Sequence, residues 1–183
     1  MFYLIACELV DRMPLFIVTG DPCMGKTTAV MRVAEILKQR GLNVGGIISR
    51  EVRKEGVRIG FEFVDINTNE TASLASIGGT GPNLGKYSID IEGCGFAVRV
   101  LRRALVNADI VICDELGPME FKSKEFIDCV KDMLNLDKLV IAVVHKKLKY
   151  PVIDQFREKA SFMINLDIQN RNKVPYLLLD RLE

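Results

Sequence analysis

The sequence predicts an α/β fold with a mainly parallel sheet and an added β-meander. The apolar runs Leu15–Val18, Ile110–Cys113 and Leu139–Val144 are short and unbroken, as expected of strands that are buried on both faces. A helical pattern separates the first run from the strand predicted at Val44–Ser49, and such a strand–helix–strand unit joins parallel strands by a crossover. The alternating polar and apolar residues that follow indicate strands with one exposed face.

The length of 183 residues favours one domain with a substantial core. We assign residues 13–183 to this domain. Residues 1–12 are treated as an N-terminal extension, because Met13, just before the first strand, is a second candidate start.

The charge balance excludes several partner classes. The 25 Lys and Arg residues nearly cancel the 24 Asp and Glu residues, so we expect no nucleic-acid partner. No apolar run approaches the roughly 20 residues that span a bilayer, so no membrane is expected either.

The five cysteines form no C-x-x-C pair, which favours free thiols and a cytoplasmic location. We expect a monomer or weak oligomer.

The stretch Gly20–Thr28 follows the first apolar run and precedes a helical pattern. It reads G-x-x-x-x-G-K-T, the phosphate-binding loop, in the strand–loop–helix context that this motif requires. Glycines let consecutive N–H groups point at phosphate oxygens, and the next helix adds the positive end of its dipole. Lys26 is expected to reach the β- and γ-phosphates, and the Thr27 hydroxyl to bind Mg²⁺. The alternative is a chance glycine-rich turn. The nucleotide-binding residues predicted here are Gly20, Asp21, Pro22, Cys23, Met24, Gly25, Lys26, Thr27 and Thr28.

The residues after the loop predict a helix and then a β-meander. Val30, Val33, Ala34 and Leu37 have the spacing of a helix that packs on a sheet. Residues 51–66 alternate like a meander that lies over the sheet or extends it. Its charges are most simply a solvated face, with an arginine that reaches phosphate as the alternative.

The next segments are a loop and a helix. Residues 77–86 are predicted to be a mobile loop by composition, with a short extended piece at Tyr87–Ile91. The stripe Phe96–Leu105 predicts a helix with Arg99, Arg102 and Arg103 on its solvent face.

A second chemical centre follows the run Ile110–Cys113. Asp114 ends this run, so its carboxylate is expected at the C-terminal edge of the sheet, where α/β proteins bind ligands. This is the Walker-B arrangement, in which Asp114 holds Mg²⁺ opposite Thr27, directly or through water. Mg²⁺ is therefore the expected cofactor.

Glu115 follows the Walker-B aspartate directly. An acid there can accept a proton from an attacking water or align that water on the γ-phosphate; the alternative is a surface acid at a strand end. Lys26 and Glu115 are thus the predicted catalytic residues. Gly117 completes D-x-x-G and is expected to permit close approach of the backbone to the γ-phosphate.

Several later residues have two interpretations. His145, which ends the strand Leu139–Val144, is either a γ-phosphate sensor or a histidine at a wet strand end. Arg171 either stacks on a purine or is simply an arginine at a helix start. Asn170 is expected to open a C-terminal helix. The leucines of this helix expected to pack on the sheet are Leu177, Leu178 and Leu182.

The chain resembles the small nucleoside-triphosphatases of thermophilic microbes, a family with a human member called cancer-related nucleoside-triphosphatase. The resemblance covers about residues 14–183. It depends on G-D-P-C-M-G-K-T-T, E-V-R-K-E-G-V-R-I-G-F at 51–61, D-E-L-G-P-M-E-F at 114–121 and the N-R pair at 170–171.

This resemblance implies a three-layer, RecA-like P-loop core and slow, Mg²⁺-dependent hydrolysis of ATP, GTP and other nucleoside triphosphates to diphosphate and phosphate. The chain lacks an N/T-K-x-D motif, so strict GTP specificity is not expected. Where the family usually has glycine, this chain has Cys23; we expect iodoacetamide to label this thiol and ATP to protect it.

Two other classes of function remain open. A nucleoside or nucleotide kinase also has a phosphate loop, although it needs an acceptor pocket and usually an arginine-rich lid. A nucleotide-dependent regulatory module is the third class. The candidate arginine fingers are Arg53, Arg58 and Arg171.

Overall fold

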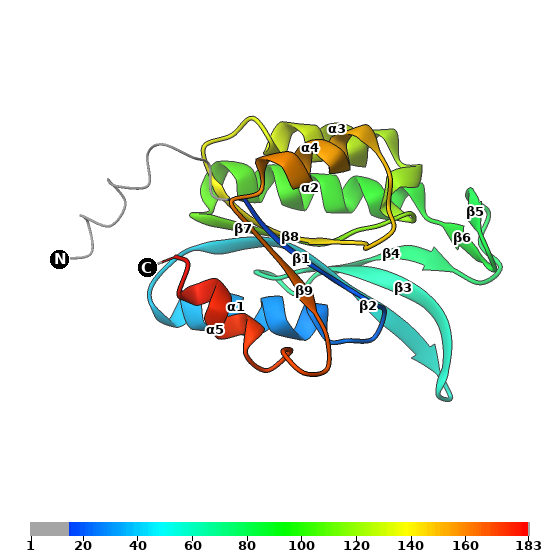
Figure 1. Cartoon of the computed structure of the whole chain (residues 1–183). Helices are drawn as coiled ribbons and strands as arrows, with labels where there is room; N and C mark the ends of the chain where they lie inside the picture. The colour runs from blue at the N-terminus through cyan, green and yellow to red at the C-terminus, as the bar shows by residue number, and fades with distance from the viewer. Residues whose placement is uncertain (1–14, 183) are drawn as a thin grey trace.

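The computed structural model describes residues 15–182 (Figure 1), so the expectations for residues 1–12 and Met13 lie outside the described part of the chain. The strands are β1 (Leu15–Gly20), β2 (Val44–Lys54), β3 (Val57–Asp65), β4 (Thr71–Ser76), β5 (Asn83–Leu84), β6 (Tyr87–Ile89), β7 (Ile110–Leu116), β8 (Leu139–Val144) and β9 (Phe162–Leu166). The helices are α1 (Lys26–Gln39), α2 (Ile91–Asn107), α3 (Lys124–Met133), α4 (Pro151–Lys159), α5 (Val174–Leu179) and the short 3-10 helix η2 (Glu120–Lys122).

All these strands form one sheet with the order β5-β6-β4-β3-β2-β7-β8-β1-β9. On one side of β2, the strands β7, β8, β1 and β9 are parallel; we call them the parallel half. On the other side, β3, β4, β6 and β5 are antiparallel; we call them the antiparallel half. The predicted α/β fold with an added meander is confirmed, and the meander extends the sheet.

Helices cover both faces of the sheet, which gives three layers (Figure 1). On one face, α1 and α5 pack on the parallel half through an apolar cluster that includes Val18, Val33 and Leu178. On the other face, α2, α3 and α4 bury a larger cluster that includes Leu101 and Phe126. Because each face of the central strands is buried, their side chains are apolar at nearly every position, as the sequence predicted.

Strand β2 joins the two halves. The sequence predicted a short strand followed by a separate meander, but β2 is one strand of 11 residues. Val44–Ile47 pair in parallel with β7, and Ile47–Lys54 pair antiparallel with β3. Gly46 sits in this junction with φ 129°, and a Cβ atom there would lie 1.9 Å from the Ile112 carbonyl oxygen. The chain can make this close approach only because residue 46 has no side chain.

Helix α2 is attached to the sheet by an ion pair that the sequence did not predict. Arg103 lies on the solvent face, as predicted, and its guanidinium also pairs with Asp65, a buried carboxylate at the end of β3. Burial alone would raise the pKa of Asp65, yet the Asn67 N–H, the Thr68 hydroxyl and Arg103 together hold it below its ordinary value. The pair therefore stays ionised and ties α2 to β3.

Two elements of the structure were not predicted from the sequence. The loop predicted at 77–86 contains β5, which pairs with β6 in a small hairpin. Helix α4 was not predicted, although Pro151 at its first turn and the buried stripe at Val152 and Phe156 are helix signals.

The C-terminal helix begins at Val174 rather than Asn170. The Asn170 side chain instead closes a turn, because its oxygen accepts from the Asp167 N–H at 2.9 Å and its amide donates to Asn165 O at 2.8 Å. The prediction for Leu177 was wrong, since its side chain is 41% exposed, whereas Leu178 is buried. Within residues 15–182, no helix is both long and apolar enough to span a bilayer.

Candidate nucleotide site

The phosphate loop connects β1 to α1 at the C-terminal edge of the parallel half. Gly20 ends β1 with φ 153°, and a Cβ atom there would lie 2.4 Å from the Leu166 carbonyl oxygen of β9. Gly25 has φ 97° and serves as the N-cap of α1. Both positions need conformations that glycine adopts easily, so the two motif glycines are explained by the backbone alone.

Lys26 lies across this loop and is almost fully buried. Its ammonium donates to the backbone oxygens of Gly20 and Asp21, each at 3.2 Å. Both of these partners are neutral carbonyl groups, so the positive charge remains available to phosphate oxygens. The Asp21 carboxylate pairs instead with Lys146, 3.2 Å away, which links the loop to the turn after β8.

Cys23 occupies a left-handed backbone conformation with φ 63°. Side chains with a Cβ atom disfavour this region, and glycine does not. A glycine at this position would adopt the same conformation without strain. Cys23 is exposed, whereas Cys94, Cys113 and Cys129 are buried free thiols.

The acids of β7 lie beside the loop. Asp114 is buried, and burial raises its pKa to about 7; the Thr27 hydroxyl and Lys26 act in the opposite direction, while Glu115 adds to the increase. The Ser49 hydroxyl of β2 donates to the Asp114 carbonyl oxygen at 3.0 Å and joins the two strands here. The predicted proximity of Thr27 and Asp114 is thus present in the structure.

Two carboxylate oxygens in this region are buried and have no hydrogen-bond partner among residues 15–182: Asp114 Oδ2 and Glu115 Oε1. Such atoms are costly unless a ligand, an ion or water satisfies them. Thr27 and Asp114 offer two oxygen ligands, and the described residues contain no group of three or more His, Cys, Asp or Glu that could hold a metal alone. This donor set fits Mg²⁺, which takes one or two protein oxygens together with phosphates and water.

Glu120, in η2, is a third acid that sequence reasoning missed. Its side chain is buried, and burial raises its pKa to about 8, against hydrogen bonds from the Glu120 and Gly117 backbones; Glu115 and Asp114 raise it further. A Cβ atom on Gly117 would lie 2.8 Å from Glu120 Oε2, so Gly117 leaves room for this carboxyl group. The motif D-E-L-G-P-M-E contained the signal, because its last acid falls where the chain turns back toward the strand end.

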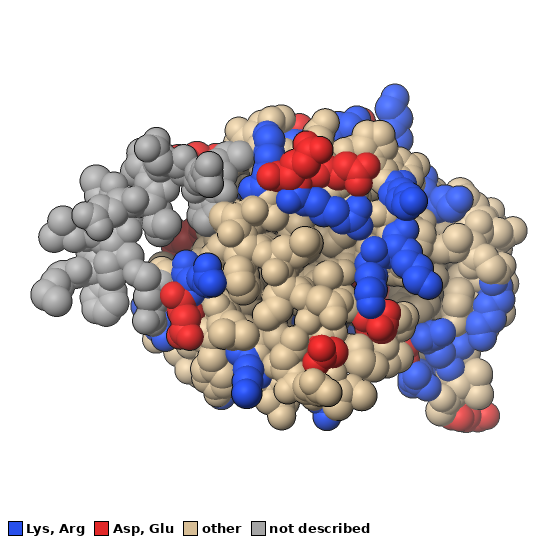
Figure 2. Space-filling model, viewed as in Figure 1, with Lys and Arg blue, Asp and Glu red and all other residues tan. Residues whose placement is uncertain are grey.

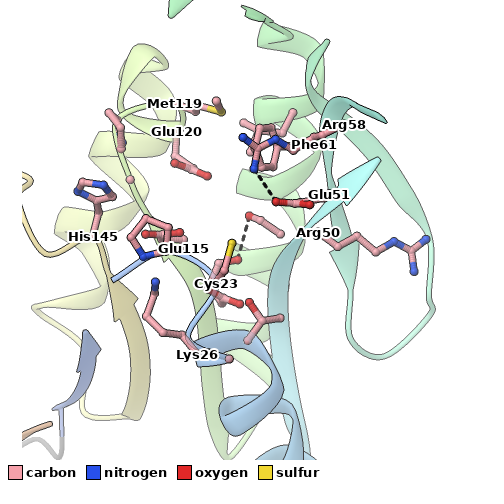
Figure 3. Close-up of a pocket in the computed structure, with 18 residues that line it drawn as sticks. Cys23, Lys26, Arg50, Glu51, Arg58, Phe61, Glu115, Met119, Glu120 and His145 are labelled. Carbon is pink, nitrogen blue, oxygen red and sulfur yellow. Dashed lines mark hydrogen bonds and ion pairs between the residues drawn. The ribbon is translucent and has the colours of Figure 1, made fainter. Parts of the chain in front are cut away.

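The loop, the β7 acids and the nearest part of the antiparallel half enclose a pocket of about 590 Å³ (Figure 3). Lys26 and Cys23 lie at one end, Glu115 lies between the ends, and Met119, Glu120, Phe61 and Arg58 lie at the other. Pro22, Cys23, Gly25, Lys26 and Thr27 are the lining residues that come from the loop.

Arg58 belongs to the pocket wall rather than to a fully solvated hairpin face. Its guanidinium donates to the Glu51 carboxylate at 2.6 Å and to the Tyr87 hydroxyl at 3.0 Å, and it lies 5.1 Å from the centre of the Phe61 ring. Three groups on three strands thus hold Arg58. Arg53 also pairs with Glu51 and does not line the pocket within the described chain.

The other predicted residues divide into two groups. Gly117 and His145 line the pocket, and the His145 ring nitrogen accepts from the Lys147 N–H at 3.3 Å. Arg171 is exposed in the turn before α5 and is not among the residues that line this pocket in the described chain. Its contact with a purine stays a prediction.

Positive charge gathers on one side of the molecule in Figure 2, where Lys and Arg side chains extend over tan surface between scattered acids. The face shown mixes both signs, in agreement with the balanced composition.

Comparisons with known proteins agree with this geometry. The sequence matches the family described as NTPase over residues 15–179. The nucleoside-triphosphatase THEP1 of Thermococcus kodakarensis is 43% identical over 169 residues, which cover 90% of this chain and 91% of that protein. THEP1 of Methanocaldococcus jannaschii is 39% identical over 166 residues, covering 90% and 95%.

Two solved structures share the fold. The crystal structure of THEP1 from Aquifex aeolicus has a TM-score of 0.79 and 28% identity, covering 92% of this chain and 98% of that one. The solution structure of a human cancer-related nucleoside triphosphatase has a TM-score of 0.79 and 27% identity, covering 93% and 97%.

Proposed function

The chain belongs to the NTPase family and is a nucleoside-triphosphatase related to the THEP1 proteins; we propose that it hydrolyses ATP, GTP and other nucleoside triphosphates to diphosphate and phosphate with Mg²⁺. One observation carries the proposal. Asp114 and Glu115 each have a buried carboxylate oxygen without a partner among residues 15–182, and both line the pocket that contains Lys26. A metal-bound triphosphate and a water molecule would satisfy these oxygens.

Each residue has a distinct task in this proposal. Backbone N–H groups of the loop and Lys26 bind the phosphates, and Lys26 stabilises charge that develops on the transferring group. Thr27 and Asp114 would hold Mg²⁺, which neutralises the phosphate oxygens when it is bound. Glu115 aligns the attacking water in line with the γ-phosphorus and accepts its proton.

The proposed acceptance of several nucleoside triphosphates follows from the contacts that bind the nucleotide. The phosphate contacts are independent of the base, and the chain lacks the N/T-K-x-D motif that selects guanine. Arg171, if it stacks on a base, would accept any purine through a planar contact. The free thiols support a cytoplasmic location within the proposal.

Product analysis tests this function. The protein is incubated with ATP, GTP, CTP or UTP in Mg²⁺ and then in excess EDTA, and the nucleotide products are separated by ion-exchange chromatography. We expect diphosphate and phosphate in equal amounts from all four, and a loss of at least about 100-fold in rate with EDTA, since the metal stabilises the transferring charge. Release of monophosphate and pyrophosphate, or unchanged rates in EDTA, would contradict the proposal.

A further inference from the structure

We propose that the end of the pocket beyond the β7 acids receives a second substrate, a nucleoside, whose hydroxyl group accepts the γ-phosphoryl group. The proposal rests on the nucleotide binding proposed at Gly20–Thr28. It adds a phosphotransferase activity to hydrolysis at the same site.

The pocket is larger than hydrolysis requires. Its volume is about 590 Å³, which falls in the range of roughly 300–1,000 Å³ that holds whole small molecules. A single attacking water needs only about 30 Å³. The γ-phosphate and its metal are expected at the end near Lys26, and Phe61, Met119 and Glu120 line the opposite end.

The additional space lies on the γ-phosphate side of the loop. Lys26 and the Thr27–Asp114 pair mark the γ end of a bound triphosphate. From Asp114 the wall continues through Glu115 to Glu120, and it returns across Phe61 and Arg58 (Figure 3). We call this part of the pocket, which is lined by Glu115, Glu120, Phe61 and Arg58, the chamber. The chamber therefore faces the γ-phosphorus atom, which is the atom that is attacked. Arg171, the predicted base contact, is not part of its described wall.

The far wall has the chemistry of a site for a flat ring. Phe61 and Met119 supply apolar surface there, and Leu74 and Pro118 also line the pocket. The Phe61 ring is held by Tyr87, whose ring lies edge-on with centroids 5.3 Å apart. An aromatic ring fixed in this way is a stacking surface for a nucleobase.

The charges of the chamber favour an uncharged acceptor over a nucleotide. Arg58 pairs with Glu51 at 2.6 Å, a carboxylate that it shares with Arg53, and Arg50 pairs with Glu62 at 2.6 Å. The acids Glu115 and Glu120 have no such arginine partner among the ion pairs of residues 15–182. A second phosphate group would meet arginines that carboxylates already engage, whereas hydroxyl groups can hydrogen-bond with Glu120.

The transfer step is balanced without another reactant. The acceptor's hydroxyl oxygen forms a bond with the γ-phosphorus, and the bond from this phosphorus to the β–γ bridging oxygen breaks. The nucleoside diphosphate leaves with the electron pair, and the hydroxyl proton passes to Glu115. Water and the nucleoside hydroxyl therefore compete for the same position.

Labelled ATP tests the inference directly. The full chain is incubated with Mg²⁺, γ-³²P-ATP and either adenosine, guanosine, cytidine, uridine or thymidine, and the products are separated by thin-layer chromatography. We expect labelled nucleoside monophosphate from at least one nucleoside, with a matching decrease in labelled phosphate. Labelled phosphate alone with all five nucleosides would overturn the inference and leave the proposed hydrolysis intact. If neither product forms, both proposals fail.

Filling the chamber tests its position. Met119→Trp places a larger side chain against the far wall, and we expect the ratio of labelled monophosphate to labelled phosphate to fall at least about tenfold, as in pockets where added bulk excludes a substrate. Met163→Trp is the matched control, because Met163 is 54% exposed on β9 and lies outside the pocket lining; its ratio should equal that of the unmodified chain. Thermal melting of both variants verifies folding. Equal ratios in all three proteins would overturn the assignment, and a smaller variant, Met119→Ala, should restore transfer.

Discussion

The two halves of the sheet contribute differently to the site. The parallel half carries the groups expected to bind phosphate and metal, each at the C-terminal end of a strand: the loop after β1 and the acids of β7. The antiparallel half carries Arg58 and Phe61, which together with Glu51 of β2 close the pocket from the other side. Phosphate chemistry is therefore localised to one half, while the size and polarity of the remaining pocket depend on the other.

The halves also differ in how their residues are held. In the parallel half, buried oxygens of Asp114 and Glu115 remain without partners among residues 15–182, as expected of groups that await a ligand. In the antiparallel half, Arg58 is fully engaged by Glu51, Tyr87 and Phe61. We conclude that the parallel half supplies the groups that react with the nucleotide, whereas the antiparallel half determines the shape of the pocket.

Glu115→Gln is expected to have the largest effect. The amide keeps the size of the side chain but cannot accept a proton, so we expect kcat to fall about 10³-fold, within the range for loss of a general base. The dissociation constant for ATP should change less than about threefold, because the loop supplies the binding groups. Rates come from phosphate release and affinities from calorimetry. Glu125→Gln, an exposed acid on α3, is the control, and an equal loss in both variants would assign the effect to charge alone.

Gly46→Ala tests whether β2 must join both halves. The new Cβ would lie 1.9 Å from the Ile112 carbonyl oxygen, so β2 and β7 must separate, and we expect the free energy of unfolding to fall by about 3 kcal/mol. Urea denaturation measures this change.

Gly95→Ala on α2 is the matched control for Gly46→Ala. Its Cβ would meet only Arg99 Nη1 at 3.7 Å, so we expect a gain of up to about 1 kcal/mol from helix propensity. A loss of the same size at both positions would show that Gly46 has no special role.

Glu120→Gln tests how much the third acid of the pocket contributes to the pH dependence of stability. Its pKa is raised to about 8 by burial, so the folded state binds a proton that the unfolded state releases above about pH 4.5, and its contribution to stability decreases as pH rises. From pH 6 to 8 this loss is about 2 kcal/mol for one group with such a shift. The glutamine variant, titrated in urea at both pH values, should lose less stability over this range. A pH dependence identical to that of the unmodified chain would exclude Glu120 as its source.

Cys23→Gly is expected to have the smallest effect. Glycine relieves the left-handed conformation at φ 63°, but it also increases the entropy of the unfolded chain, so we expect a gain of at most about 1 kcal/mol. Thermal melting measures it, with ATP affinity unchanged. A clear decrease in stability would mean that the thiol makes a contact that offsets the backbone strain.

The parallel half was predictable because its signals are local. The patterns of Gly20–Thr28 and of the apolar run before Asp114 can each be recognised within one strand and one turn. The structure has both segments where they were expected. The phosphate-loop context and the buried run therefore sufficed to predict neighbouring strands at one edge of the sheet.

The antiparallel half was less predictable because its roles depend on distant partners. Arg58 was predicted to be most simply a solvated charge, with a contact to phosphate as the alternative; its contacts with Glu51 and Tyr87, which hold it in the pocket wall, were not predicted. Arg103 is exposed, as predicted, but its ion pair with Asp65 at the end of β3 was not predicted. Arg58 and Tyr87 are 29 residues apart in the sequence, and Arg103 and Asp65 are 38 residues apart, so a local sequence pattern cannot predict these contacts.

Isotope transfer from water tests the central claim most directly. Hydrolysis of ATP in H₂¹⁸O with Mg²⁺ identifies the phosphorus that water attacks, because the attacking oxygen remains with it. We predict one ¹⁸O atom in each released phosphate and none in ADP, with the same labelling at a much lower rate in Glu115→Gln. Label in ADP, or an unchanged rate in Glu115→Gln, would contradict the proposal that Glu115 directs water to the γ-phosphate.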